Sequence, residues 1–193
     1  MIIAFTGAGI SKASGIPTFD EMGDLRTKLD RDYANRHRKE FSNIMEMLKQ
    51  TCQQAEPNDA HMVLAEYNIP TITMNIDGLH EEALKRLGKD HKRVVEVHGN
   101  VFKDNVVLYG DSAPSYEKAY RLIRRMRKND VLLIVGTSYY TSVSTWVKTL
   151  AEMTGASIVE INNDAEHKVR EYIENNKDKI GDYVRFLRRE ELY

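Results

Sequence analysis

The sequence predicts an α/β fold in which a parallel sheet is covered by helices on both faces. Short apolar runs alternate with segments of helical periodicity, which is the order of strand–helix–strand units. The runs are rich in Val, Ile and Leu, as strands buried on both faces are. Polar or glycine-rich turns follow several runs and predict a ligand site at the carboxyl edge of the sheet. The predicted strands are 2–5, 71–74, 94–97, 106–108, 131–135 and 157–161.

Helical patterns fill the intervals between these runs, at 78–87, 115–128, 142–153 and 165–175. The pair Asn129 and Asp130 interrupts the helical pattern just before the strand at 131–135. Residues 20–56 differ from the rest, because 24–40 is dense in charge and 41–48 is amphipathic. We expect a small helical insertion over the site, the alternative being a solvated helical hairpin.

Composition narrows the class of protein. A length of 193 residues suits a single domain spanning 1–193, and 41% hydrophobic with 30% charged residues is ordinary for a globular protein. The net charge of −1 gives no indication of nucleic-acid binding. The one cysteine, Cys52, excludes an internal disulfide framework. No apolar stretch has membrane-spanning length, and Met1 leads directly into the first strand without a signal peptide. We therefore expect a cytoplasmic protein.

The loop after the first strand has the composition of a phosphate-binding turn. Gly7, Ala8 and Gly9 follow the strand at 2–5 and precede a helix start. Glycine lets the backbone approach a pyrophosphate, and the free N–H groups of a helix start face its negative charge. The usual dinucleotide fingerprint is not complete, because Lys12 stands where its third glycine belongs.

The longer string GAGISxxSGIPxF over residues 7–19 resembles the start of the sirtuins, the NAD-dependent protein deacylases. The resemblance continues in order along the chain. It is carried by PNDAH at 57–61, TMNIDGLH at 73–80, VHG at 97–99, VVLYGD at 106–111, GTS at 136–138, IN at 161–162 and the tail at 181–187. It implies a Rossmann-like domain that binds NAD, with 20–56 as the mobile cofactor loop.

The resemblance also implies roles for individual residues. His98 would be the general base on the ribose hydroxyls, for which imidazole is suited because its pKa lies near neutrality. Asn75 would order the ribose or a water, and Asp77 with Ile76 would hold the nicotinamide carboxamide. Catalysis would thus fall to His98, Asn75 and Asp77. The implied cofactor-binding residues are Gly7, Ala8, Gly9, Ile10, Phe19, Asn75, Ile76, Asp77, Gly136, Thr137, Ser138, Asn162 and Asp182.

Several of these residues have an equally ordinary structural interpretation. Ser11 is expected either to cap the following helix or to touch the ligand, and Asp77 to cap the helix after it or to bind, or both. Phe19 either shields the ribose intermediate or packs in the core. Gly7 and Gly9 serve a turn in either case. His61 and His80, on predicted helices, are expected to pack or hydrogen-bond locally.

The chain departs from the family at three places. Asp20 stands where the family has a phosphate-binding Arg, so we expect Lys12, Arg26 or Lys28 to supply the positive charge. Met74 replaces a Gln. Only residues 100–105 separate His98–Gly99 from the next apolar run, where sirtuins carry a zinc ribbon of two cysteine pairs. The six histidines show no paired metal-site spacing, so we expect no zinc ribbon and no metal.

The acyl-lysine side of the site is less defined by sequence. A peptide added as a strand would use the edges at 110–113 and 139–143, where Tyr139 and Tyr140 are expected to narrow an acyl tunnel. The leading expectation is NAD-dependent lysine deacylation, with acyl transfer to ADP-ribose. NAD hydrolysis or ADP-ribosyl transfer at the same site is the first alternative, and a non-catalytic NAD or ADP-ribose sensor is the second.

Overall fold

The central strand of the protein is β1 (Ile2–Thr6), which pairs in parallel with β2 (Thr71–Thr73) on one side and β4 (Val131–Val135) on the other. The structure is a computed structural model that describes residues 1–18 and 20–181. With β3 (Val94–Glu96) and β5 (Ser157–Ile161) the sheet has five parallel strands in the order β3-β2-β1-β4-β5. This is the strand order of a Rossmann-like sheet: β2 and β3 extend the sheet on one side of β1, and β4 and β5 extend it on the other. The predicted α/β fold is confirmed.

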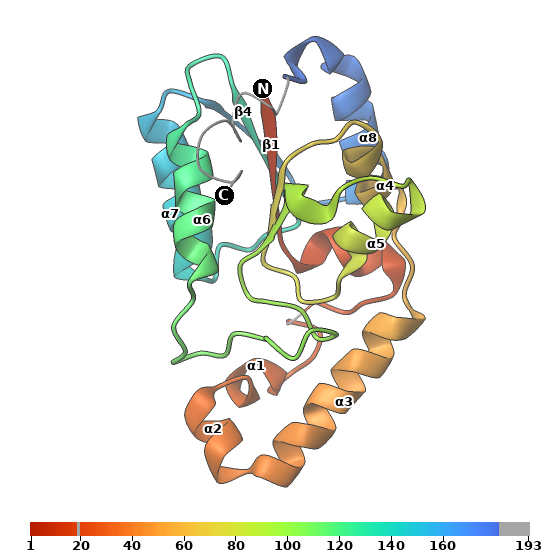
Figure 1. Cartoon of the computed structure of the whole chain (residues 1–193), viewed down its shortest axis with the longest axis vertical. Helices are drawn as coiled ribbons and strands as arrows, with labels where there is room; N and C mark the ends of the chain where they lie inside the picture. The colour runs from red at the N-terminus through yellow and green to blue at the C-terminus, as the bar shows by residue number, and fades with distance from the viewer. Residues whose placement is uncertain (19, 182–193) are drawn as a thin grey trace.

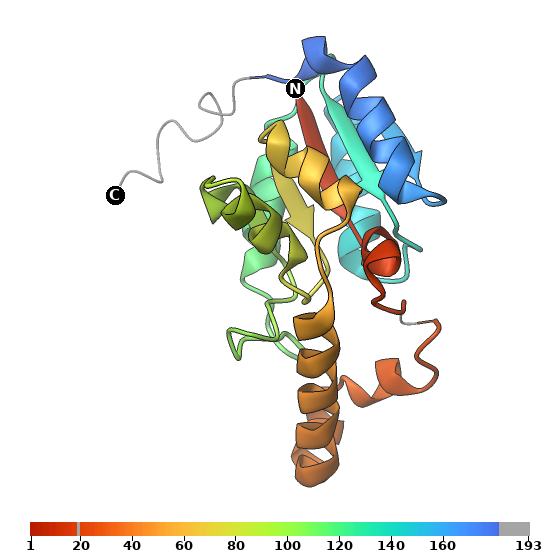
Figure 2. The same cartoon turned by 90° about the vertical axis from the view of Figure 1, so that its right-hand side faces the viewer.

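Helices cover both faces of this sheet (Figures 1 and 2). Side chains alternate along β1, so Ile3 and Phe5 pack on one face while Ile2 and Ala4 pack on the other. The first face is covered by α6 (Ser115–Arg124) and α7 (Ser142–Met153), and the second by α4 (Asp59–Glu66) and α8 (Ala165–Asn175). Helix α5 (Leu79–Arg86) packs beside α4. Short 3₁₀ turns occupy Ala8–Ser14, His91–Arg93 and Lys177–Lys179.

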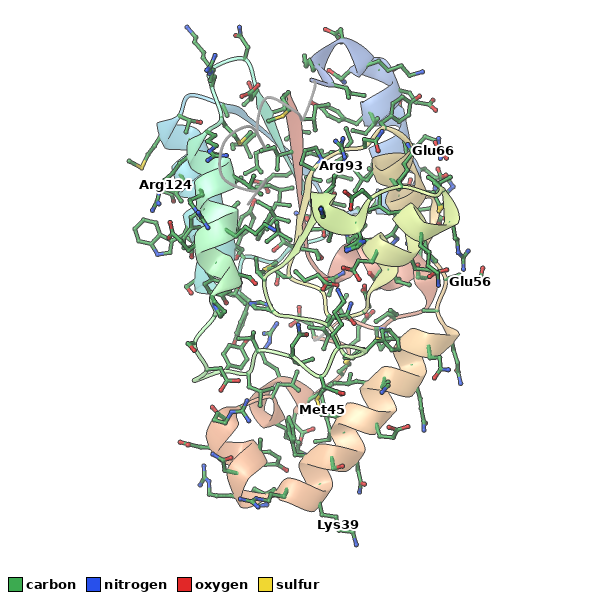
Figure 3. The ribbon with its side chains drawn as sticks, in the orientation of Figure 1. Lys39, Met45, Glu56, Glu66, Arg93 and Arg124 are labelled. Atoms are coloured by element: carbon green, nitrogen blue, oxygen red, sulfur yellow. The ribbon has the colours of Figure 1, made fainter. Side chains whose placement is uncertain are left out.

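The segment after the first loop forms the expected helical insertion. It consists of α1 (Leu25–Lys28), α2 (Arg31–Arg36) and α3 (Arg38–Gln54), placed beyond the end at which the strands terminate (Figure 1). Its apolar core, to which Leu48 contributes from α3, is completed by Leu79, Val101 and Leu108 from outside the insertion. Met45 lies on the inner side of α3, facing α1 and α2, whereas Lys39 points outward (Figure 3). The boundaries that make 1–193 one domain stay a prediction.

One predicted strand is wrong. Residues 106–108 form no strand of the sheet, because their apolar side chains are buried elsewhere: Leu108 packs in the core of the insertion. Val107 N–H donates to the His98 carbonyl, and the isolated bridge next in sequence joins Tyr109 to Asp30 of the insertion. The segment thus ties the insertion to the end of β3. The helix predicted over 115–128 ends at Arg124, four residues early.

Candidate active site

A cavity of about 690 Å³ lies at the carboxyl edge of the sheet, beside the point where strand order reverses. Parallel sheets bind ligands at this place because adjacent loops diverge there and leave a crevice. Most of its lining residues come from the segments that follow each of the five strands, and the insertion adds Arg26 and Leu29. Of the residues predicted for the site, those that line the cavity are Gly7, Ala8, Gly9, Asn75, Ile76, His98, Gly136, Thr137, Ser138 and Asn162.

The glycine loop is held against the loop after β4. Gly9 N–H donates to the Gly136 carbonyl at 2.9 Å, and Gly7 N–H donates to Val135. A Cβ on Gly9 would come within 2.6 Å of the Gly136 Cα, and one on Gly7 within 2.7 Å of the Gly136 oxygen. Side chains are therefore excluded from both loops for packing reasons alone. Because Gly7 and Gly9 have no side chain, the backbone of residues 7–9 is open to the cavity. A role in the turn and a role in ligand binding are therefore compatible.

Ser11 neither caps a helix nor lines the cavity. Its hydroxyl donates to Asp77 Oδ2 at 2.7 Å and accepts from the amide of Asn75 at 3.0 Å. Asp77 Oδ1 accepts from the backbone N–H of Leu79 at the start of α5, which is the capping role expected of it. Asp77 and Ile10 are buried behind the cavity wall, so in this structure Asp77 acts through Ser11 on Asn75, which does line the cavity.

Two buried histidines support this network. The His61 ring accepts from the Asn58 backbone at Nδ1 and lies 3.4 Å from the Ser11 hydroxyl through Nε2. His80 Nε2 lies 2.9 Å from the Thr6 hydroxyl, and the two rings are 4.8 Å apart. Burial lowers the pKa of His61 to about 3, and burial together with the neighbouring ring lowers that of His80. Both side chains are therefore neutral. His61 makes the local bond that was expected, to Asn58, whereas His80 bonds Thr6, which is distant in sequence.

His98 faces the cavity with a defined tautomer. Its Nδ1 lies 3.1 Å from the Met74 carbonyl, and because a carbonyl only accepts, Nδ1 carries the proton. The lone pair is then on Nε2, which accepts from the hydroxyl of Tyr116 at 2.8 Å. Burial lowers the pKa of His98, with the bond to Met74 acting in the opposite direction. At neutral pH the imidazole is an unprotonated base, as general-base chemistry requires.

The far end of the cavity lies between β4 and β5. The Asn162 side chain accepts from the Thr137 N–H at 3.1 Å and so joins the two strand ends. Thr137 is buried, whereas Ser138 is exposed. Both lie where hydroxyl groups can bond a sugar or a phosphate. Phe19 and Asp182 lie outside the described residues.

Arg26 is the one cation among the described residues that line the cavity. Its guanidinium lies 3.6 Å from the centre of the Tyr140 ring and 3.6 Å from the Asp20 carboxylate. The other two candidates for the missing charge are engaged away from the cavity. Lys12 pairs with Glu21 at 2.6 Å, and Lys28 pairs with two insertion carboxylates at 3.1 Å each. Of the three candidates, Arg26 is therefore the one that lines the cavity.

The family model described as the Sir2 family matches residues 7–105. An NAD-dependent protein deacetylase of Bacillus thuringiensis subsp. konkukian (strain 97-27) is 30% identical, in an alignment that covers 96% of this chain and 91% of the relative. This chain belongs to the Sir2 family. An NAD-dependent protein deacylase of Thermococcus sibiricus is also 30% identical, over 83% of this chain and 80% of the relative.

Solved structures of the family share the fold. A Sir2 homolog–NAD complex matches with a TM-score of 0.77 at 19% identity, covering 93% of this chain and 90% of that one. A Sir2 protein bound to acetylated peptide matches with a TM-score of 0.75 at 24% identity, covering 92% and 93%.

The loop after His98 is a compact turn. The alignment with the Bacillus relative extends over 231 positions, more than the 193 residues of this chain, so the relative has segments without a counterpart here. Gly99 turns with a φ of +76° where a Cβ would overlap Asn105, and the Asn105 side chain accepts from the Asn100 N–H at 2.8 Å.

Among residues 1–18 and 20–181, no group of three or more metal-ligating side chains is present. No helix of that part is long and apolar enough to cross a membrane.

The two predicted peptide edges of this Sir2 protein meet at the cavity. Residues 109–111 and 140–142 both line it. Tyr109 is fixed by backbone bonds to Leu29 and Arg31, and Arg31 makes a two-pronged ion pair with Asp111 at 2.6 and 2.7 Å. Tyr140 reaches the cavity, whereas Tyr139 packs against the core beneath α7 and does not narrow it.

Sequence reasoning missed Tyr116. A tyrosine in the first turn of a helix carries no mark of a site in the sequence. Its contact with His98 arises only because α6 packs along β3.

Proposed function

We propose that this protein is an NAD-dependent protein lysine deacylase, which cleaves nicotinamide from NAD and transfers the acyl group to ADP-ribose. The observation that carries the proposal is the neutral His98, which lines the same cavity as the glycine loop and Asn75 and whose Nε2 carries the lone pair. Relatives that cover nearly the whole chain are named NAD-dependent protein deacetylases. A cytoplasmic location, expected from the composition, belongs to this proposal.

The cavity fits NAD in size and in the chemistry of its walls. Backbone at Gly7–Gly9, together with Arg26, is suited to the diphosphate, and Thr137, Ser138 and Asn162 to the adenosine ribose. Bound NAD supplies an electrophilic ribose carbon, whose bond to nicotinamide is the one that breaks. The shielding role of Phe19 and the adenine contact of Asp182 remain proposals from the resemblance.

The residues near His98 then divide the work of the reaction. His98 Nε2 takes a proton from a ribose hydroxyl, because it is the unprotonated nitrogen. Asn75 orients the ribose from the end of β2, held by the hydroxyl of Ser11. Asp77 fixes that serine and the start of α5, and Ile76 lines the wall beside them.

NAD hydrolysis or ADP-ribosyl transfer is the second candidate function. The short loop at 99–105 favours it, because it leaves less protein around an acyl-lysine peptide, and Met74 in place of Gln changes the ribose contacts. A non-catalytic NAD or ADP-ribose sensor is the third. All three functions use the same NAD-binding walls, so activity and not affinity separates them.

Nicotinamide release distinguishes these functions. We would measure it with and without acetyl-, succinyl- and longer-chain acyl-lysine peptides, in wild type, His98→Ala and His91→Ala. His91 is an exposed control histidine, with 72% of its side chain accessible. Release that requires peptide and is lost only in His98→Ala supports the deacylase. Release without peptide supports the hydrolase or transferase, and NAD binding without release supports the sensor.

A further inference from the structure

The side chain nearest to the reactive nitrogen of His98 is a tyrosine to which the reaction assigns no task. Tyr116 lies in the first turn of α6, and its hydroxyl is 2.8 Å from His98 Nε2. Its ring is tilted against the His98 ring at 5.8 Å and is met edge-on by Tyr120 at 6.2 Å, one turn further along the helix. Tyr116 itself lines the cavity.

The direction of this hydrogen bond follows from the other side of the ring. The Met74 carbonyl takes the proton of Nδ1, so Nε2 has only its lone pair to offer and Tyr116 must be the donor. Burial raises the pKa of Tyr116, which keeps the phenol in its donating form. A phenol donates more strongly than it accepts, since its oxygen lone pair is delocalised into the ring. The contact is therefore better for neutral His98 than for the imidazolium.

We propose that Tyr116 is a positioning residue for His98, which holds Nε2 toward the cavity and stabilises the neutral base until a ribose hydroxyl takes its place. This inference rests on the proposed role of His98. Nε2 has one lone pair, so the phenol and the ribose hydroxyl occupy it in turn. The exchange replaces one hydrogen bond by another and costs little, while the imidazole is already oriented when NAD arrives.

Tyr116 acts on Nε2 directly through its hydrogen bond, and several charged groups in the described part of the site have partners of their own. Asp20 lies by Arg26, and Asp111 is paired with Arg31. On β3, Glu96 bonds Asn100 and Lys103, and on α6 Glu117 pairs with Arg124. The tyrosines that share the cavity or flank Tyr116 are Tyr109, Tyr120 and Tyr140.

The test is Tyr116→Phe, with Tyr120→Phe as a matched control that loses a hydroxyl on the same helix. Loss of a hydrogen bond to the neutral base raises the pKa of His98. If such a bond contributes about 0.5–1.5 kcal/mol, its loss raises the pKa of His98 by roughly 0.4–1.1 pH units. We expect the acid limb of kcat/KM for NAD to move up by that amount in Tyr116→Phe. On the acid limb, kcat/KM for NAD should fall roughly 3- to 10-fold, whereas kcat should change less because the ribose hydroxyl has replaced Tyr116 at Nε2 in the complex. Tyr120→Phe should leave the limb in place.

A measurement that needs no activity separates this proposal from that of the deacylase. Histidine-ring NMR of the ligand-free protein, assigned with His98→Ala, gives the His98 tautomer and pKa directly. We expect the Nδ1–H tautomer in wild type and a higher pKa in Tyr116→Phe. An unchanged pKa, or an equal shift in Tyr120→Phe, overturns the positioning role even if deacylation is confirmed. Loss of the proposed function with the NMR shift intact would leave the positioning contact standing.

Discussion

The two buried histidines predict an acid-sensitive fold. In the unfolded chain a histidine has a pKa of about 6.5, whereas burial lowers that of His61 to about 3 and also lowers that of His80. Below pH 6.5 the unfolded chain therefore binds protons that the folded protein excludes, and stability falls as the pH falls. The free energy lost is about 1.4 kcal/mol per histidine per pH unit, hence about 2 kcal/mol for each ring at pH 5.

Urea unfolding at pH 8 and pH 5, followed by circular dichroism, measures this loss. We expect the pair to account for about 4 kcal/mol of the decrease, and His61→Gln or His80→Gln to remove about half of it. Burial raises the pKa of Glu96, which changes stability in the opposite direction but equally in all variants. His91→Gln, at an exposed site, is the control. Equal pH dependence in wild type and both buried-site variants would refute the reasoning.

Three further predictions concern the cavity and its surroundings. Gly136→Ala should lower the free energy of unfolding by more than about 2 kcal/mol, because its Cβ would overlap the glycine loop. Gly88 has a similar φ and open space around it, so Gly88→Ala should cost about 1 kcal/mol. Equal unfolding midpoints for the two variants would contradict this. Measured by calorimetry, NAD binding should be about 10-fold weaker in Arg26→Ala and unchanged in Lys12→Ala and Lys28→Ala. Unaltered affinity in all three variants would show that none of these cations binds the phosphate. Dialysis against a chelator should leave Tm unchanged, and stoichiometric zinc in the purified protein would contradict the zinc-free prediction.

Strands β1 and β4 were predictable because they are buried on both faces and consist almost wholly of apolar residues. Strands β2, β3 and β5 contain Thr, Ser or Glu as well, so their apolar pattern is less complete. The same rule failed at 106–108, where Leu108 is equally apolar but finds its burial in the helical insertion. An apolar run predicts that a segment is buried, but it does not predict which part of the chain buries it.

The site was predictable where a residue follows a strand and less so where tertiary packing decides. Asn75, His98 and Gly136 follow strand ends, and parallel strands bring those ends to one edge. For Ser11 the sequence predicted either helix capping or ligand contact. In the structure its hydroxyl instead links Asp77 to Asn75. Such links depend on the register between distant segments, which spacing along the chain does not contain.

The choice of Arg26 over Lys12 and Lys28 also needed the structure. All three lie in one charged stretch, and the sequence offers no way to tell which of them faces the cavity. In the structure Arg26 lines the cavity, whereas the two lysines pair with carboxylates that do not line it.

The central claim is that His98 and the NAD-binding walls serve acyl transfer. The most direct measurement is mass spectrometry of the products formed from NAD and an acyl-lysine peptide, with nicotinamide quantified in the same reaction. We expect acyl-ADP-ribose and nicotinamide in a one-to-one ratio, both lost in His98→Ala and retained in His91→Ala. Nicotinamide accompanied only by free ADP-ribose, with the peptide still acylated, would contradict it.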